Sequence, residues 1–276
     1  MVQILGIVNI TSDSFSDGGQ FLQPDDAVSH ARALLRDGAD MLDLGAASSN
    51  IHSSPVSEEE EIRRLDDVLD SLRREHPSVP VSVDTFKPAV QRHCLRKGID
   101  CLNDIQGFPF PELYPVLSDS SARLIVMHSV QRMGIATEIQ TDPIQVFDGI
   151  LRFFEQRILS LTQAGIDEQR IIIDPGMGHF LGSNPESSLY VLQHIQDLKN
   201  HFHLPVLIAV SRKSFLARIS HCDADLSIPI ARRRAAATLA AELFAARNGA
   251  DIIRTHDVQA LRTALQTEQT IQSFFL

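Results

Sequence analysis

Short, mainly apolar runs recur along the chain, and each ends in polar or small residues. The runs occupy residues 4–8, 41–44, 79–83, 101–102, 123–127, 171–173, 206–210 and 251–253. A strand buried on both faces, as in a parallel sheet, is continuously apolar, so these runs predict parallel strands. Stretches with helical spacing lie between them, such as 25–36, which Gly38 ends, 143–164 and 230–247.

This alternation of strands and helices predicts the fold class. Eight strand-then-helix units in 276 residues, without a linker, are typical of a single α/β domain over 1–276, a (β/α)8 TIM barrel. The alternative is a doubly wound sheet, which would need a glycine-rich phosphate-binding turn after a strand. Neither a G-x-G-x-x-G nor a Walker A pattern occurs, so we favour the barrel.

Composition and charge narrow the class of protein further. The chain is 43% hydrophobic and 22% charged, as expected of a folded globular protein, and its net charge of −10 argues against non-specific nucleic-acid binding. No apolar run approaches the roughly 20 residues that span a membrane, and strand pattern begins at residue 4, which leaves no room for a signal peptide. Three cysteines without a C-x-x-C pair indicate idle thiols of a cytoplasmic protein, not a structural zinc site.

Polar side chains follow the apolar runs where the strands should end, and in a barrel these ends meet at one mouth. They are Asn9, Asp84, Asn103, Asp174, Lys213, Arg254 and His256. A single buried aspartate is more often a structural partner than a ligand, but seven such residues at successive strand ends favour a site. Asp84, Asn103 and Asp174 suit a flat heterocycle with a guanidine-like edge, because a carboxylate accepts two parallel N–H bonds.

The remaining residues suggest an anion-binding group and a loop that acts as a lid over the site. Asn9, Arg254 and His256 form a second group that suits an anion or a metal-bound phosphate. The loop 11–19 is rich in turn-forming residues and carries Phe15. Ordinary turn chemistry explains such a loop, and so does a lid whose phenylalanine covers a substrate while an aspartate reaches the reacting centre.

Seven motifs, in order along the chain, resemble those of dihydropteroate synthase. They are LGIVNITSDSFSDGG at 5–19, VDTFKP at 83–88, LND at 102–104, MH at 127–128, IDPGMG at 173–178, SRKS at 211–214 and RTHD at 254–257. The resemblance runs from the first predicted strand to the eighth. It implies a TIM barrel and a transferase of folate biosynthesis, which joins 6-hydroxymethyl-7,8-dihydropterin pyrophosphate to p-aminobenzoate and yields 7,8-dihydropteroate and pyrophosphate.

The resemblance also implies roles for single residues. It implies pterin contacts at Asp84, Asn103, Asp174 and Lys213, pyrophosphate contacts at Asn9, Ser49, Arg254 and His256, and p-aminobenzoate contacts at Phe15, Arg212 and Ser214. It implies catalytic roles for Phe15, Asp17, Asp84 and Lys213. Mg²⁺ is the implied cofactor, with Asn9 as its protein ligand, and a homodimer is the implied assembly.

One loop departs from the common bacterial pattern of this family. Where that pattern reads G-E-S-T-R-P, residues 46–51 read AASSNI, so Asn50 replaces the arginine, Ile51 replaces the proline, and Ser49 keeps the hydroxyl. This loop, with NDIQGFP at 103–109, MHSVQ at 127–131 and SRKSFL at 211–216, resembles the sulfonamide-insensitive subgroup. His179 departs from the phenylalanine usual in that subgroup. The resemblance implies an enzyme that accepts p-aminobenzoate and tolerates sulfonamides.

Two alternatives share the pterin pocket. A pterin-binding methyltransferase barrel gives no reason for the group at Arg254 and His256, and it normally needs a corrinoid partner, for which this chain has no domain. A catalytically silent pterin-binding protein is the other alternative, given the altered loop. Release of pyrophosphate on mixing both substrates separates a synthase from a binder.

Overall fold

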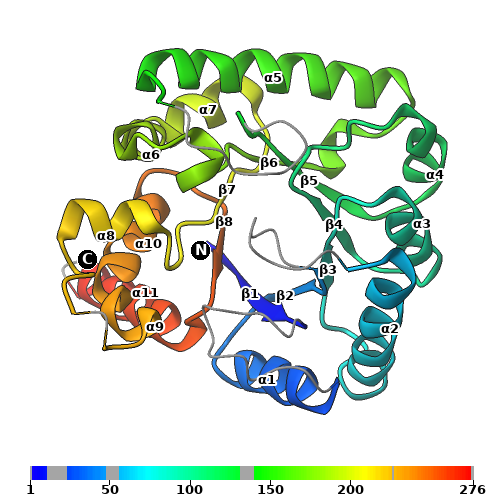
Figure 1. Ribbon diagram of the computed structural model, residues 1–276, viewed down its shortest axis with the longest axis horizontal. Coiled ribbons are helices and arrows are strands. Elements are labelled where there is room, and N and C mark those ends of the chain that lie inside the picture. Colours follow the sequence, from blue (N-terminus) through cyan, green and yellow to red (C-terminus); the bar gives the residue numbers. More distant parts are fainter. Residues whose placement is uncertain (1, 11–23, 48–55, 131–139, 226, 275–276) are drawn as a thin grey trace.

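The computed structural model describes residues 2–10, 24–47, 56–130, 140–225 and 227–274. Within these ranges, eight parallel strands form one sheet in the order β6–β5–β4–β3–β2–β1–β8–β7. The strands are β1 (Gln3–Asn9), β2 (Met41–Gly45), β3 (Val81–Asp84), β4 (Cys101–Asp104), β5 (Arg123–Met127), β6 (Ile171–Asp174), β7 (Leu207–Ile208) and β8 (Ile252–Thr255). They ring the centre of the molecule (Figure 1).

The first and last strands of this order meet and close the ring. Ile173 of β6 pairs in parallel with Val206, which directly precedes β7. The Ile173 amide also donates a hydrogen bond to the Pro205 carbonyl oxygen at 2.9 Å. A closed sheet leaves no exposed edge, and the predicted TIM barrel is confirmed.

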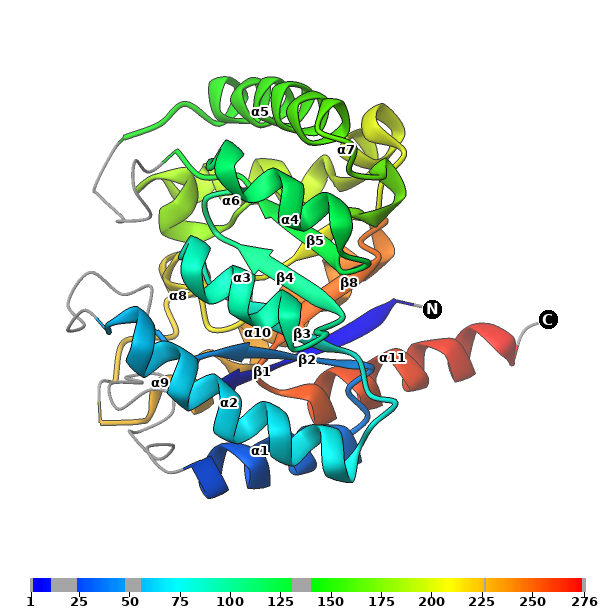
Figure 2. The same cartoon turned by 90° about the vertical axis from the view of Figure 1, so that its right-hand side faces the viewer.

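Helices cover the outside of the barrel. They are α1 (Pro24–Arg36), α2 (Glu58–Glu75), α3 (Pro88–Arg96), α4 (Tyr114–Asp119), α5 (Pro143–Gln163), α6 (Pro185–Gln193), α7 (Ile195–Phe202), α8 (Ser214–Ser220), α9 (Ile230–Arg233), α10 (Ala235–Arg247) and α11 (Val258–Ser273). Seen from the side, α1 to α5 succeed one another around the sheet (Figure 2). Over the described ranges, no helix is both long and apolar enough to cross a membrane.

The helix predicted over 230–247 is wrong in one respect, because it is interrupted at Arg234. There α9 ends and α10 begins. The Arg234 guanidinium donates a hydrogen bond to the Arg212 carbonyl oxygen at 2.7 Å and forms an ion pair with Asp223. These contacts hold the backbone at the junction against the β7–α8 loop.

Strand alternation divides the barrel interior into an apolar layer and a polar layer. The apolar layer consists of Leu5, Met41, Cys101, Ile125, Ile172, Leu207 and Ile252. Side chains on one face of a strand recur every second residue. Asp43, Asn103, Asp174 and Arg254 therefore share the interior face with Met41, Cys101, Ile172 and Ile252, one step closer to the carboxyl ends. The fold thus gathers charged and amide groups at the mouth.

Candidate active site

The polar layer draws one side chain from each of several strands. It comprises Asp43 of β2, Asp84 of β3, Asn103 of β4, Asp174 of β6 and Arg254 of β8. Asp43, Asn103 and Asp174 are almost completely buried. Burying such groups costs free energy unless they are paired, so their contacts show how the site is held together.

Arg254 links the carboxylates of this layer. Its Nε lies 2.6 Å from Asp43 Oδ2, and a terminal nitrogen lies 2.9 Å from Asp84 Oδ2. Asn103 Nδ2 donates to the same Asp43 oxygen at 3.1 Å. Arg254 thus contacts residues that line the region expected to hold a heterocycle. The anion-binding role that the sequence predicts for it together with Asn9 and His256 stays a prediction.

Asp43 is a member of the layer that the sequence interpretation missed. It lies inside β2, two residues before the strand end, and is 0% exposed. The available signal was a charged residue inside the apolar run MLDL, at the interior position that follows Met41. A buried charge inside a parallel strand needs a partner, and Arg254 supplies it.

Two acceptors in the layer remain without a hydrogen-bond partner among the described residues. They are Asp43 Oδ1 and Asn103 Oδ1. Buried polar atoms are rarely left unpaired, because each unsatisfied group costs about 1–3 kcal/mol. These oxygens can accept hydrogen bonds from a ligand bearing N–H groups.

A glycine turn holds Asp174 at the end of β6. The Gly176 amide donates to Asp174 Oδ1 at 2.8 Å. Gly176 has φ +75°, and a Cβ at this position would lie 2.3 Å from the His128 carbonyl oxygen. Only glycine fits, so the sequence Asp174-Pro175-Gly176 fixes the carboxylate in place.

Burial changes the pKa values of the ionisable side chains in the site. Desolvation raises the pKa of Asp174 to about 6, against a hydrogen bond from Gly176 and the charge of Lys213. Desolvation also raises the pKa of Asp84, although Arg254 opposes this. Desolvation and the charge of Arg254 lower the pKa of Lys213 to about 8. The site thus holds acids and a base that can exchange protons near neutral pH.

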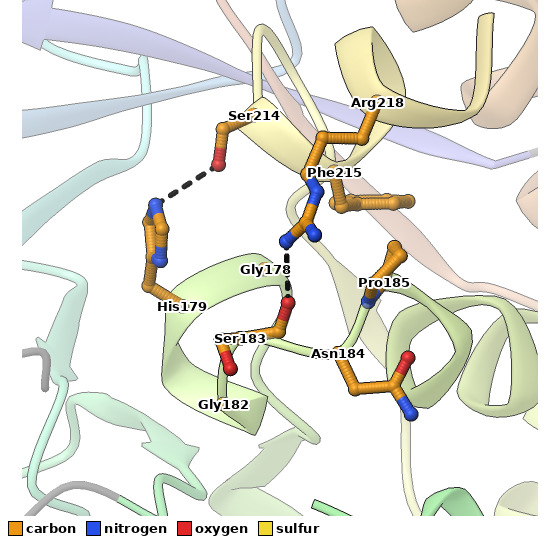
Figure 3. A pocket seen from close by; sticks show the side chains of 9 residues that line it. All are labelled: Gly178, His179, Gly182, Ser183, Asn184, Pro185, Ser214, Phe215 and Arg218. Atoms are coloured by element: carbon orange, nitrogen blue, oxygen red, sulfur yellow. Dashed lines mark hydrogen bonds between the residues drawn. The ribbon is translucent and has the colours of Figure 1, made fainter. Parts of the chain in front are cut away.

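A small pocket lies between η4 (Gly178–Leu181), which follows β6, and α8, which follows β7 (Figure 3). It is lined by Gly178, His179, Gly182, Ser183, Asn184, Pro185, Ser214, Phe215 and Arg218. Ser214 Oγ lies 3.0 Å from His179 Nε2, and Arg218 donates to the Ser183 carbonyl oxygen at 2.6 Å. Ser214 was expected at a p-aminobenzoate subsite, and His179 occupies part of its hydrogen-bonding capacity.

The other expected residues lie at neighbouring strand ends. Asn9 is the last residue of β1, and His256 follows β8, with Nδ1 2.9 Å from Ser211 Oγ. The Arg212 amide, after β7, donates to Thr238 Oγ1 at 3.1 Å. Among the described residues, no group of three or more His, Cys, Asp or Glu side chains could hold a metal ion.

Three of the expected residues lie outside the described ranges. They are Phe15, Asp17 and Ser49. The altered positions Asn50 and Ile51 lie there as well, so the roles expected for both loops remain predictions.

Comparison with known proteins agrees with this geometry. The pterin binding enzyme family matches residues 5–256. Dihydropteroate synthase type-3 of Escherichia coli is 50% identical over 271 residues, which are 98% of this chain and 100% of that protein. The chain belongs to the dihydropteroate synthase family. The resemblance noted in the sequence is thereby confirmed.

Solved structures of this family have the same fold. Dihydropteroate synthase of Xanthomonas albilineans with 4-aminobenzoic acid has a TM-score of 0.85 and 35% identity, covering 98% of this chain and 93% of that one. The same enzyme in complex with 7,8-dihydropteroate has a TM-score of 0.80 and 31% identity, with coverage of 98% and 93%. A synthase of this family needs a pterin pocket, and the polar layer of the barrel is the candidate.

Proposed function

We propose that this chain joins 6-hydroxymethyl-7,8-dihydropterin pyrophosphate to p-aminobenzoate, forming 7,8-dihydropteroate and pyrophosphate. The observation that carries the proposal is the set of buried hydrogen-bond acceptors Asp43, Asn103 and Asp174 in the polar layer of the barrel. A pterin presents ring N–H groups and an exocyclic amine along one flat edge. Carboxylate and amide oxygens accept such donors, and charge-assisted hydrogen bonds are about twice as strong as neutral ones.

We assign the reaction steps by charge. The bond between the pterin methylene carbon and the pyrophosphate oxygen breaks, and its electron pair leaves with the pyrophosphate. The arylamine nitrogen then bonds to the methylene carbon and loses a proton. Positive charge develops on the pterin, where the Asp84 carboxylate can stabilise it, and negative charge develops on the leaving group, where Arg254 and His256 can stabilise it. The arylamine needs positioning more than a strong base.

Mg²⁺ would fit the leaving-group side of this site. Mg²⁺ usually keeps several waters and binds through one or two protein oxygens together with substrate phosphates. The Asn9 side chain offers one amide oxygen at the end of β1, which suits an ion that arrives with the pyrophosphate. When bound, the ion would neutralise charge on the leaving group. The homodimer, the lid at 11–19 and the single domain over 1–276 also remain proposals.

We assign the p-aminobenzoate carboxylate to the region of Ser214 and Arg212. The support is the position of Ser214 at the start of α8, facing the pocket in Figure 3. Phe215 and Pro185 are among the residues that line this pocket. A bulkier, tetrahedral sulfonyl group can be rejected there by a steric clash that a planar carboxylate avoids.

Sulfonamide tolerance follows as a prediction. We expect an ordinary KM for p-aminobenzoate and a raised Ki for a sulfonamide, because residues 46–51 and Phe215 follow the insensitive pattern. A discrimination of ~3 kcal/mol would already raise Ki more than 100-fold. Both constants are measured on the purified protein, and similar values of KM and Ki would contradict the prediction.

The proposed function is tested with both substrates together. We expect pyrophosphate release and formation of 7,8-dihydropteroate only when p-aminobenzoate is present. Pterin binding without product, measured by calorimetry on the same sample, would instead identify a catalytically silent pterin-binding protein. Transfer of a methyl group without pyrophosphate release would identify the methyltransferase alternative.

A further inference from the structure

Lys213 differs from the other lysines of the chain in the partner of its ammonium group. The chain has four lysines, and Lys87, Lys97 and Lys199 form ion pairs with carboxylates at 2.6–2.7 Å. Among the described residues, Lys213 Nζ has no hydrogen bond or ion pair and lies 4.7 Å from the centre of the Phe180 ring. An aromatic ring thus takes the place that a carboxylate takes at the other lysines.

Two neighbouring strands bring this pair together. Phe180 lies in η4, which follows β6, and Lys213 directly precedes α8, which follows β7. The two strands adjoin where the barrel closes. The Val130 amide donates to the Phe180 carbonyl oxygen at 2.9 Å, and the Lys213 amide donates to the Val210 carbonyl oxygen at 3.1 Å. Hydrogen bonds therefore hold the backbone on both sides of the contact.

The glycine before this aromatic residue makes room for the lysine side chain. A Cβ on Gly178 would lie 3.4 Å from Lys213 Cδ and 3.7 Å from Lys213 Cβ. The aliphatic part of Lys213 therefore passes close over Gly178, and its ammonium lies over the ring two residues later. Lysine side chains commonly pack in this way, with the methylene groups against the protein and the charge at the end. One short turn thus contacts both parts of the side chain.

The ring acts on the charge of Lys213. The face of an aromatic ring is electrically negative and attracts a cation within about 6 Å of its centre, so it favours the ammonium over the neutral amine. Charged groups face Lys213 from three strands: Arg254 of β8 opposes protonation, whereas Asp174 of β6 and Asp84 of β3 favour it. Desolvation is the largest effect and lowers the pKa of Lys213 to about 8. The ring therefore opposes desolvation at a lysine that titrates near neutral pH.

We propose that Phe180 is a positioning residue that holds Lys213 at the mouth of the barrel and keeps its amine protonated. An ammonium group has three hydrogen-bond donors and no acceptor. Protonated Lys213 can therefore donate to an acceptor of the substrate, whereas the neutral amine carries no charge and presents a lone pair. The role in substrate binding rests on the proposed function, whereas the protonation of Lys213 does not.

The alternative is that Phe180 only shields Lys213 from water. The two explanations predict opposite changes in Phe180→Leu, which keeps an apolar side chain but has no ring. Loss of the cation–π attraction should lower the pKa of Lys213. If the ring only excluded water, the smaller leucine would let water reach the ammonium and raise this pKa, because desolvation disfavours the charged form.

Carbon NMR of protein labelled with ¹³C at the lysine Cε measures the protonation directly. The resonance of Lys213 is assigned by its loss in Lys213→Arg. We expect Lys213 to titrate about 0.5–1.5 pH units lower in Phe180→Leu than in wild type. Phe180→Tyr keeps the face of the ring and should titrate like wild type. The resonances of the other three lysines are the internal control and should coincide in all of these proteins.

Phe180→Met provides a second variant without a ring, so the test does not depend on the folding of Phe180→Leu. Methionine is unbranched and fills irregular space, and we expect the same lower titration of Lys213. An equal or higher pKa of Lys213 in the variants without a ring would overturn the proposal. A titration in Phe180→Tyr that follows Phe180→Leu would overturn it as well, because the ring would then not be the cause.

The pH dependence of kcat/KM for the pterin pyrophosphate tests the consequence for the reaction. We expect the loss of activity at high pH to begin at a lower pH in Phe180→Leu, by the same interval as the NMR titration, and to begin at the wild-type pH in Phe180→Tyr. An unchanged profile in Phe180→Leu would overturn the link between the charge of Lys213 and substrate binding. A lower titration of Lys213 in a protein without synthase activity would contradict only the proposed function.

Discussion

At the scale of single residues, the buried carboxylates of the mouth carry the sharpest prediction. Asp174→Asn should weaken binding of the pterin pyrophosphate by about 2–3 kcal/mol or more, because one charged acceptor is lost in a buried site. Calorimetry measures this change, and wild-type affinity in the variant would contradict the assignment of Asp174.

Asp104→Asn is a matched control for this substitution. Asp104 is also a buried aspartate at a strand end, but its carboxylate accepts hydrogen bonds from Gln91, from the Gln106 amide and from the Phe108 amide. We expect this variant to lower the free energy of unfolding and to leave pterin affinity unchanged. The comparison separates a ligand contact from a structural one.

Arg254 gives a second prediction, which the structure changes. From the sequence alone, Arg254→Ala should weaken pyrophosphate and leave binding of the bare pterin alcohol nearly unchanged. In the structure Arg254 is the partner of Asp43 and Asp84, so its loss leaves buried carboxylates without their countercharge. We now expect affinity for both ligands to fall, and calorimetry with each compound measures this. Unchanged binding of the pterin alcohol would instead support the expectation from the sequence, in which Arg254 binds only the anion.

At the scale of elements, the glycine after β6 is the position where the backbone leaves least freedom. Gly176→Ala should lower the free energy of unfolding by more than ~1 kcal/mol, because a side chain meets the His128 carbonyl oxygen at 2.3 Å and φ is +75°. Gly149→Ala is the control: Gly149 lies within α5, and a Cβ there meets nothing within 4 Å. It should stabilise the protein by about 0.5–1 kcal/mol. Urea unfolding compares the two, and equal effects would contradict the prediction.

The strands and their order along the chain could be predicted because a strand that is buried on both faces appears in the sequence as a continuous apolar run. The run at 171–173 is apolar throughout, the run at 123–127 is apolar after Arg123, and both lie within one residue of β6 and β5. The polar residues that end these runs could be predicted too, since alternation carries Asp174 onto the same face as Ile172.

Contacts between distant strands could not be predicted in this way. Arg254 is separated by 211 residues from Asp43 and by 170 from Asp84. Periodicity shows which face each side chain occupies, but not which neighbour a long guanidinium selects across the barrel. The interruption at Arg234 has a similar cause, because its partners Asp223 and Arg212 belong to other segments.

At the scale of the whole molecule, buried ionisable groups make stability depend on pH in opposing ways. Desolvation raises the pKa of Asp174 to about 6 and that of Glu242 to about 8. Desolvation also lowers the pKa of His128 to about 4. Compared with the unfolded chain, the folded protein keeps protons on these acids to higher pH and loses the proton of His128 at lower pH. The acids therefore make stability fall as pH rises, whereas His128 makes stability rise with pH. Only below the usual histidine pKa of about 6.5 do the two effects oppose each other.

The last prediction uses the pH range above that value. Between its ordinary pKa of 4.5 and about 8, folded Glu242 binds a proton that the unfolded chain lacks, so its contribution to stability falls as pH rises. From about pH 6.5 to pH 8 the free energy of unfolding should therefore fall by about 1–2 kcal/mol more in wild type than in Glu242→Gln, at 1.36 kcal/mol per pH unit. Urea unfolding of both proteins at the two pH values measures this difference. Parallel changes in the two proteins would show that Glu242 is already ionised in the folded state.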